Sequence, residues 1–212
     1  MGERYPEPGR GLSGAWDRFV GPGTTGVENA GTAAAAILGA AVGFAGDPTA
    51  RSWGPLRRGA AAVLGADLFG GVWANATPAA TRWYHGRGQG AREQVAFSAF
   101  HIVQLLLVAA LYRDRDWRFV IGNYAYLLAA TYAVASTPAP HRRAVALALC
   151  LGAFWLNTAV WRPTPGMGWF APVFFLKLLA SHAAGEAPTR GWKPSHKYLG
   201  RITMHPNRTK PS

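Results

Sequence analysis

An acidic residue, Asp67, lies in the middle of the apolar segment 59–77, and no other feature constrains the fold as strongly. The segment is long and apolar enough to cross a membrane. A carboxylate that faces lipid at this depth costs at least about 2.5 kcal/mol. The side chain must therefore face other protein groups or water, which makes Asp67 a candidate for a functional site.

Six apolar runs are separated by short polar loops. They cover residues 29–45, 59–76, 95–112, 119–136, 144–161 and 168–184. Each is close to the lower limit of the roughly 17–25 residues that span a membrane, and backbone in hydrocarbon must satisfy its own hydrogen bonds, which favours helices. We therefore predict an all-α polytopic membrane protein with about six short transmembrane helices. Five spans are the alternative, since the first run is only marginally hydrophobic and Pro172 favours a kinked or re-entrant last run.

These runs divide the chain into three parts. Residues 1–28 form a polar N-terminal arm, which is rich in glycine and proline and is expected to be irregular. Residues 29–184 form the transmembrane helical domain, and residues 185–212 form a basic C-terminal tail. Lys and Arg are concentrated in the arm, the tail and the loops after the second and fourth runs, so the positive-inside rule predicts that both termini are cytoplasmic. The composition, rich in Ala, Gly and Arg, suggests a bacterial plasma membrane.

The charge of the chain fits a membrane surface better than nucleic acid. Only 15% of the residues are charged, against about 25% in a typical soluble domain, yet the net charge is +12. The arginines lie between apolar runs, where anionic lipid headgroups attract them, so we expect membrane lipids as partners. No zinc finger, helix-turn-helix or basic stripe with interleaved aromatic residues favours nucleic acid. A membrane-protein partner or a second copy of the chain is the alternative.

Small residues recur every four positions in the first run, at Gly31, Ala35, Gly39 and Gly43. This spacing places them on one face of a helix, which predicts close packing against another helix.

The single cysteine, Cys150, excludes an intrachain disulfide framework and a thiolate zinc cluster. We interpret it as a small buried apolar residue.

Several polar residues accompany Asp67 inside the apolar runs. Asn75 lies eight residues after Asp67 and faces nearly the same side of a helix. Lys177 is a second charge, and pairing it with Asp67 would lower the cost of burying both ions; snorkelling towards the membrane surface is the alternative. Asn123 and Asn157 are interpreted as residues that join helices by hydrogen bonds.

A compact polar group follows the second run at one membrane surface. It contains Arg82 and Trp83, with Arg82 suited to bind a phosphate, and His85, which could exchange protons near neutral pH. A solvated loop is the alternative. His101 lies inside the third run, one turn before Gln104, and is either a hydrogen-bonded structural residue or a proton carrier.

The histidines do not form a metal-binding pattern. None of the six is spaced as His-x-x-x-His or His-x-x-His, so we predict no metal site and no cofactor. The stretch 67–71, Asp-Leu-Phe-Gly-Gly, resembles the opening Asp-Phe-x-Ser-Gly stretch of the plasmanylethanolamine desaturase family. Val72, Trp73, Ala74 and Asn75 stand where the histidines of that family follow, so its iron site is not expected here.

The first functional hypothesis is a small integral-membrane enzyme that acts on a lipid or another hydrophobic substrate at a polar site around Asp67. The alternatives are a non-catalytic accessory subunit or assembly protein, and a proton-coupled carrier, so enzymatic activity is left open. The candidate catalytic residues are Asp67, Asn75, His85 and His101. The candidate residues for binding the substrate or its headgroup are Arg82, Trp83 and Lys177.

Overall fold

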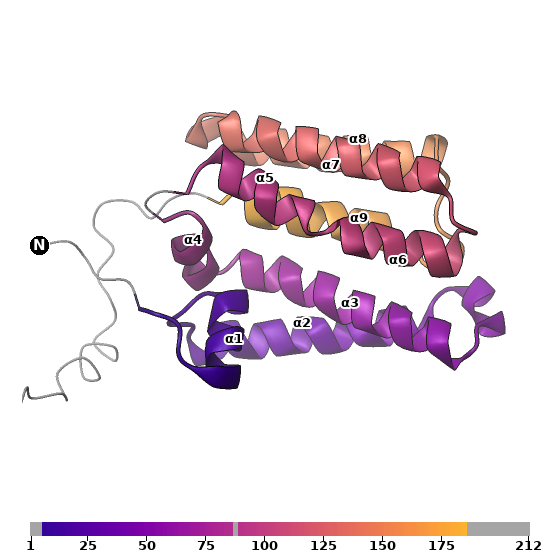
Figure 1. Ribbon diagram of the computed structural model, residues 1–212, viewed down its shortest axis with the longest axis horizontal. Helices are drawn as coiled ribbons and strands as arrows, with labels where there is room; N and C mark the ends of the chain where they lie inside the picture. Colours follow the sequence, from indigo (N-terminus) through magenta and orange to yellow (C-terminus); the bar gives the residue numbers. More distant parts are fainter. Residues whose placement is uncertain (1–5, 87–88, 186–212) are drawn as a thin grey trace, which may run out of the picture.

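The computed structural model describes residues 6–86 and 89–185, which form a helical bundle (Figure 1). The helices are α1 (Gly11–Val20), α2 (Gly26–Ala45), η1 (Pro48–Ser52), α3 (Pro55–Asn75), α4 (Pro78–Tyr84), α5 (Ala91–Ala99), α6 (Ile102–Tyr112), α7 (Trp117–Ser136), α8 (Ala139–Ala159), α9 (Phe170–Phe175) and η2 (Leu176–Ala183). η1 is a 3-10 helix, and η2 is a π-helix, in which hydrogen bonds join residues five apart. The described residues contain no strand, which confirms the predicted all-α class.

The helices begin where the sequence supplies capping groups. Thr25 starts α2 with a capping box: its hydroxyl accepts the Glu28 backbone N–H, and the Glu28 carboxylate accepts the Thr25 N–H. Thr77 caps α4 and Asp116 caps α7 through their side-chain oxygens. Pro55 occupies the first turn of α3, where its missing N–H leaves no hydrogen bond unmade. Each side-chain cap satisfies a backbone donor that the helix cannot, and contributes about 1 kcal/mol.

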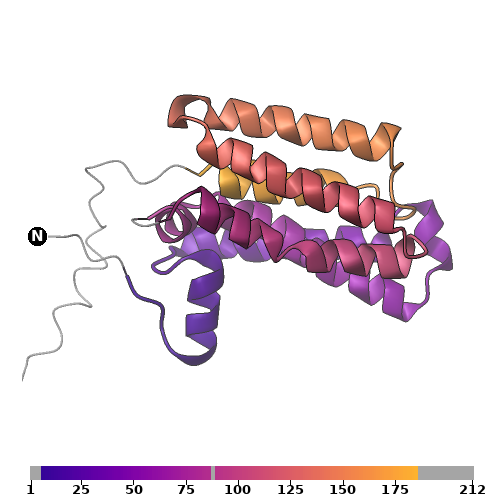
Figure 2. The same cartoon turned by 45° about the horizontal axis from the view of Figure 1, so that its top comes forward.

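The last helical segment, α9 with η2, lies at the centre of the bundle (Figures 1 and 2). It packs against α3, α7 and α8 and buries Phe174, Phe175, Leu178 and Leu179. The sequence makes this run the least secure of the six because it contains Pro172. In the structure Pro172 falls in the first turn of α9, where a proline is tolerated, and the helix continues beyond it.

α2 and α3 form a closely packed pair along one side of the bundle (Figure 1). Gly39 and Gly65 face each other, and a Cβ atom on either residue would overlap the backbone carbonyl of the other. Gly43 lies in the same way against the carbonyl of Ala61. The packing role predicted for the small-residue stripe is therefore confirmed at Gly39 and Gly43.

The connections between helices lie at two opposite ends of the bundle. One end, which we call the α4 end, holds α1, α4 and the turn between α7 and α8 (Figures 1 and 2). The other, which we call the η1 end, holds η1, the turn between α6 and α7, and the connection from α8 to α9. Arg142 donates to the Gly185 carbonyl at the α4 end, and Asp47 accepts the Gly166 N–H at the η1 end.

Part of the N-terminal arm is ordered, although the sequence predicts an irregular segment over residues 1–28. Residues 11–20 form α1, and Val20 is buried at the α4 end. The hydroxyl of Tyr84 donates to the backbone carbonyl of Arg18, which holds α1 against α4. The predicted basic tail, apart from Gly185, lies outside the described residues.

Three helical segments are long and apolar enough to cross a membrane. They are Gly26–Ala45, Ala91–Tyr112, which comprises α5 and α6, and Trp117–Ser136. Large apolar side chains such as Ile37 on α2 and Ile121 on α7 are exposed on the outside of the bundle. Exposed apolar surface of this kind marks contact with lipid or with another protein, so the fold is compatible with a membrane protein.

The contact between α2 and α3 can be tested with matched substitutions. Gly39→Ala should lower the free energy of unfolding by about 1–3 kcal/mol, because the new methyl group must push α3 away. Gly59→Ala, where a Cβ atom meets no neighbouring atom, should leave it unchanged or raise it by up to about 1 kcal/mol. Denaturant-induced unfolding in detergent measures both, and equal effects of the two substitutions would contradict the close packing.

Candidate functional site

Asp67 of α3 forms an ion pair with Lys177 of η2, which confirms the pairing predicted from the sequence. The Lys177 Nζ atom lies 2.9 Å from Oδ1 and 2.8 Å from Oδ2 of the carboxylate, so the ammonium group faces both oxygens. The side chain of Lys177 is 3% exposed, whereas that of Asp67 is 31% exposed. The bundle therefore encloses the ammonium group of Lys177, while one side of the Asp67 side chain, which we call its accessible flank, remains exposed.

Two further residues shape the ion pair. Gln104 of α6 donates a hydrogen bond from its side-chain nitrogen to Asp67 Oδ2 over 3.2 Å. Gly71, one turn after Asp67 on α3, lies directly against the Lys177 side chain, and a Cβ atom there would overlap its terminal methylene groups. The glycine therefore supplies the space through which the lysine reaches the carboxylate.

The π-helical geometry of η2 turns His182 towards the side that carries Lys177. In an α-helix, residues five apart point about 140° away from each other, and the wider π turn brings them closer into line. The His182 ring is buried and stacks on Phe97 with the centroids 3.7 Å apart. Its Nε2 atom has no hydrogen-bond partner within residues 6–86 and 89–185. His182 is not among the predicted site residues, because nothing in the sequence indicates a π-helix.

His101 lies in a turn between α5 and α6, within the third apolar run. Its Nδ1 atom is 3.0 Å from the carbonyl oxygen of Phe97. A carbonyl can only accept, so Nδ1 carries a proton and Nε2 is the basic nitrogen of the neutral ring. The Phe97 ring lies beside both His101 and His182. The charges of Asp67 and Lys177 both act electrostatically on His101, although within the described residues its hydrogen bond is to Phe97 and not to either ion.

The remaining predicted site residues lie nearer the α4 end. Asn75 is eight residues beyond Asp67, or about 12 Å along the helix, and its side-chain nitrogen is buried without a hydrogen-bond partner in the part of the chain that the structure describes. Arg82 and Trp83 belong to α4, and His85 follows its last residue. The structure thus joins Asp67 to Lys177, with His101 within their electrostatic influence. Asn75, Arg82, Trp83 and His85 lie apart from them.

His85 connects the end of α4 to η2. Its Nε2 atom donates to the carbonyl oxygen of His182 over 2.8 Å, and the two rings have their centroids 5.7 Å apart. Burial lowers the pKa of His85, because the imidazolium would lose its hydration; the hydrogen bond to His182 opposes this change, and the charge of Arg142 adds to it.

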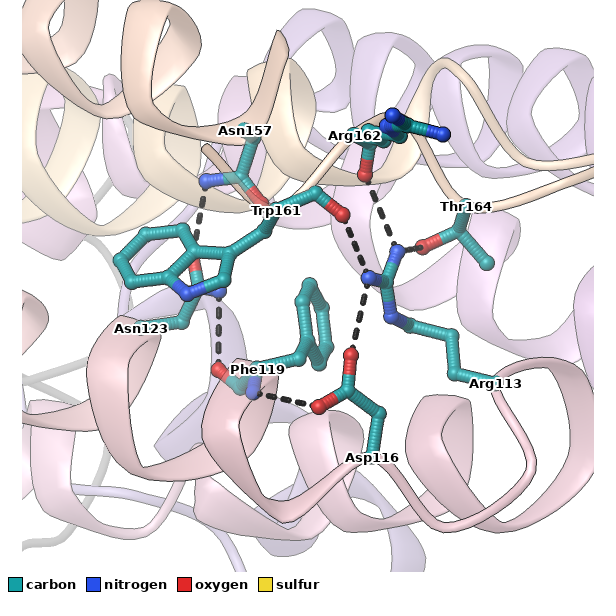
Figure 3. A network of polar contacts seen from close by, with 8 residues as sticks. All are labelled: Arg113, Asp116, Phe119, Asn123, Asn157, Trp161, Arg162 and Thr164. Carbon is teal, nitrogen blue, oxygen red and sulfur yellow. Dashed lines mark hydrogen bonds and ion pairs between the residues drawn. The ribbon is translucent and has the colours of Figure 1, made fainter. Parts of the chain in front are cut away.

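A second polar network, which was not predicted from the sequence, surrounds Arg113 at the η1 end (Figure 3). The guanidinium donates to the backbone carbonyls of Trp161 at 2.6 Å and Arg162 at 3.0 Å, and pairs with Asp116 at 3.0 Å. It also lies over the Phe119 ring, 4.3 Å from the centroid. These contacts link the connection after α8 to the turn between α6 and α7. In the sequence, the alternating Arg and Asp residues of this turn resemble an ordinary solvated loop.

Asn123 and Asn157 join α7 to α8 beside this network, as predicted for interhelical hydrogen bonds. The Asn157 side-chain nitrogen donates to Asn123 Oδ1 over 2.8 Å, and the Asn123 nitrogen donates to the Phe119 carbonyl over 2.9 Å (Figure 3). Both side chains are buried. The prediction of a helix-joining role is confirmed.

No protein family, curated protein or solved structure matches this chain. Its chemistry has to be inferred from the groups that meet around Asp67. These groups are a carboxylate paired with an ammonium, a carboxamide donor and a basic imidazole nitrogen. Among the described residues, no group of three or more His, Cys, Asp or Glu side chains is arranged to hold a metal ion.

Removing one ion of the pair should destabilise the protein more than removing both. Lys177→Met leaves the Asp67 carboxylate without its partner and should lower the free energy of unfolding by about 3–5 kcal/mol. The double variant Asp67→Asn/Lys177→Met should recover most of this loss, because uncharged side chains need no counter-ion. Chemical unfolding of the variants in detergent checks this; a double variant as unstable as Lys177→Met would show that the charges are not coupled.

The pKa of His85 gives a prediction for pH. Because this pKa is lowered in the folded protein, the unfolded chain binds more protons below its own value of about 6.5. Stability should therefore fall as the pH drops below about 6.5, and His85→Gln, which keeps a donor for the His182 carbonyl, should reduce that fall. Thermal unfolding followed from neutral to mildly acidic pH measures the slope. His141→Gln, at an exposed histidine of the α4 end, is the control, and an unchanged slope in His85→Gln would contradict the prediction.

Proposed function

We propose that this chain is a multi-pass integral membrane protein that crosses the bilayer six times. The three segments apolar enough to span lie alongside α3, α8 and α9 with η2 in one bundle, so a bilayer around the first three surrounds the others (Figures 1 and 2). α3 and α8 each carry two arginines near their start, Arg57 and Arg58 in α3 and Arg142 and Arg143 in α8. At helix ends these side chains can reach the lipid headgroups.

The orientation follows from the charge bias of the sequence. The α4 end receives the N-terminal arm, the loop after α4 and the turn before α8, which are rich in Lys and Arg. The positive-inside rule puts this end in the cytoplasm. We propose a bacterial plasma membrane with both termini on the cytoplasmic side.

The accessible flank of Asp67 supports a binding site within the membrane, and this observation carries the proposal. An ion pair that serves only stability is best enclosed on all sides, because each charge is costly in hydrocarbon. Here Lys177 is enclosed and Asp67 is not. Val63, one turn before Asp67, is 69% exposed, and Val103, next to Gln104 on α6, is 63% exposed. Lipid chains would therefore border the accessible oxygen.

The ligand of this flank is the polar end of a lipid or of another hydrophobic molecule, whose apolar part stays in the bilayer. A hydroxyl or amine on the molecule would donate to Asp67, while Lys177 behind it balances the charge. In a reaction, Asp67 would act as general base or electrostatic anchor, and His101 would carry the proton on its Nε2 atom. Gln104 would hold the carboxylate in position.

The predicted residues at the α4 end have a separate place in this proposal. Arg82 and Trp83 on α4 would contact a headgroup at the membrane surface, where arginine suits phosphate and tryptophan suits the interface. His85 would exchange protons there. Asn75, on α3 between this surface and Asp67, would contact the part of the molecule that joins the two regions.

A non-catalytic accessory or assembly protein is the second candidate function, and the surface of α2 favours it. α2 packs mainly against α3 and exposes Ile37, Leu38 and Phe44 on its other side. An exposed apolar helix is suited to pairing with a helix of another membrane protein. In that case the ion pair would serve stability alone.

The double variant Asp67→Asn/Lys177→Met separates the two functions, because it removes both charges and is expected to fold. Wild type and variant are produced in the same cells and purified with native lipid, and the bound molecules are compared by mass spectrometry. A binding role predicts that one class of lipid or amphiphile falls about 10–100-fold in the variant, since a charge-assisted hydrogen bond contributes about 1.5–3 kcal/mol. Asp114→Asn makes the same acid-to-amide change at an exposed position of the η1 end, where asparagine tolerates the positive φ angle, and should leave the bound molecules unchanged.

Equal lipid content in wild type and double variant, with both proteins folded and monodisperse, would contradict the binding site. If a membrane protein that accompanies the wild type is lost instead, the accessory function is supported.

A further inference from the structure

A pocket lies between the end of α8 and the start of α9, at the η1 end of the bundle. It encloses about 160 Å³. Its lining is mainly apolar: Phe154, Met167, Ala171 and Pro172 supply the walls, and Gly168 leaves one side without a side chain. Asn157, Thr158 and Thr164 are the polar residues of the lining. An apolar cavity of about 150 Å³ accommodates a molecule the size of benzene. This pocket therefore matches the end of a hydrocarbon chain and is too small for a headgroup.

The pocket has a buried floor and an exposed rim. Met167 is buried, whereas Phe154 and Thr158 on α8 are exposed. On the same helix, Leu151 and Trp155 are also exposed, at 70% and 61%. If the bundle crosses a bilayer as proposed, these side chains contact lipid, and acyl chains stand at the mouth of the pocket.

An exposed arginine is adjacent in the chain to the lining of the pocket. Arg162 immediately precedes Pro163, which lines the pocket, and it is exposed. Its backbone carbonyl accepts from Arg113, but its own guanidinium points away from that network (Figure 3). In the described part of the chain no acidic side chain is paired with Arg162, whereas Arg113 is paired with Asp116.

The backbone of Arg162 turns sharply after α8. Its φ angle is +59°, in the left-handed region that a residue following a helix often adopts. Asp114 and Arg115 at the same end also have positive φ angles, so this conformation belongs to the turn and does not by itself indicate a ligand. The exposed arginine and the neighbouring apolar pocket together suit a molecule that carries an anionic group and a hydrocarbon chain.

We propose that an anionic phospholipid binds here, with its phosphate on Arg162 and the end of an acyl chain in the pocket between α8 and α9. The inference rests on the proposed membrane placement and is independent of the Asp67 site. Lipid is the most concentrated molecule around a pocket that faces the bilayer. The arginine selects an anionic headgroup, since a cation gains more from a net negative lipid than from a zwitterionic one.

Photocrosslinking in lipid nanodiscs tests the acyl-chain contact. Wild-type protein is reconstituted in nanodiscs of phosphatidylcholine that contain a small fraction of a photoreactive probe lipid. The probe is phosphatidylglycerol in one sample and phosphatidylcholine in the other, and each carries a diazirine in one acyl chain. After irradiation, the labelled peptides are identified by mass spectrometry. We expect labelling to concentrate on residues 154–172. Gly168→Phe, which places a ring where a Cβ atom meets open space, should remove most of it, and the matched Gly59→Phe should not.

The headgroup contact is tested with Arg162→Gly. This substitution relieves the left-handed strain, so the unfolding temperature should be unchanged or higher. The preference of the pocket for the phosphatidylglycerol probe should nevertheless fall about fivefold, the effect expected from one arginine at an anionic surface. Arg92→Ala, which removes an exposed arginine at the α4 end, should leave that preference unchanged.

Two results would overturn the proposal. One is labelling spread evenly along α8 and insensitive to Gly168→Phe; the other is equal labelling by both probes in wild type and in Arg162→Gly. Failure of the membrane placement is distinguished by loss of the protein from the nanodisc fraction. Failure of the Asp67 site alone would leave the pocket labelling intact, and the double variant Asp67→Asn/Lys177→Met should show normal labelling here.

Discussion

The contact between Lys177 and Asp67 is the interaction on which the rest of this structure depends. Two opposite charges among apolar helices are tolerable only if they meet, because either ion alone would cost several kcal/mol. The lysine reaches the carboxylate through the space that Gly71 leaves, and a side chain at position 71 would displace its terminal methylene groups. The π-helix that carries Lys177 also carries His182, so its geometry sets the direction of both side chains. η2 lies at the centre of the bundle (Figure 1), where its apolar residues Leu178 and Leu179 are buried as well.

Around this centre, stability depends on close contact between helices. In a bilayer the surroundings of a helix are as apolar as leucine, so burying apolar groups between helices adds little stability. Close packing and interhelical hydrogen bonds contribute more of the free energy of folding. The approach of α2 and α3 at Gly39 and Gly65, and the hydrogen bond between Asn123 and Asn157, are contacts of this kind. They hold the outer helices in place, while the Asp67 carboxylate remains accessible where α3 meets α6.

Much of this arrangement could be predicted from the sequence, for physical reasons that differ between residues. The ion pair was predictable because unpaired charges are so costly in hydrocarbon, and the glycine stripe because its four-residue spacing marks a helix face. The role of His182 was not predictable, since it depends on a π-helix, and an α-helical spacing would point it away from Lys177. The Arg113 network depends on backbone carbonyls of a distant turn, which a sequence pattern does not report. α1 was missed because its order comes from contacts with α4 rather than from its own glycine-rich sequence.

The most direct test of this account is the distance between the two ions in a lipid bilayer. Solid-state NMR on protein in liposomes, with labelled Lys177 Nζ and Asp67 Cγ, measures the dipolar coupling between these nuclei. The account predicts the strong coupling of a hydrogen-bonded pair, consistent with N–O distances of 2.8 and 2.9 Å, together with contacts from lipid acyl protons to Asp67 Cγ. A coupling too weak to detect, with Lys177 reaching the headgroup region instead, would contradict the central claim.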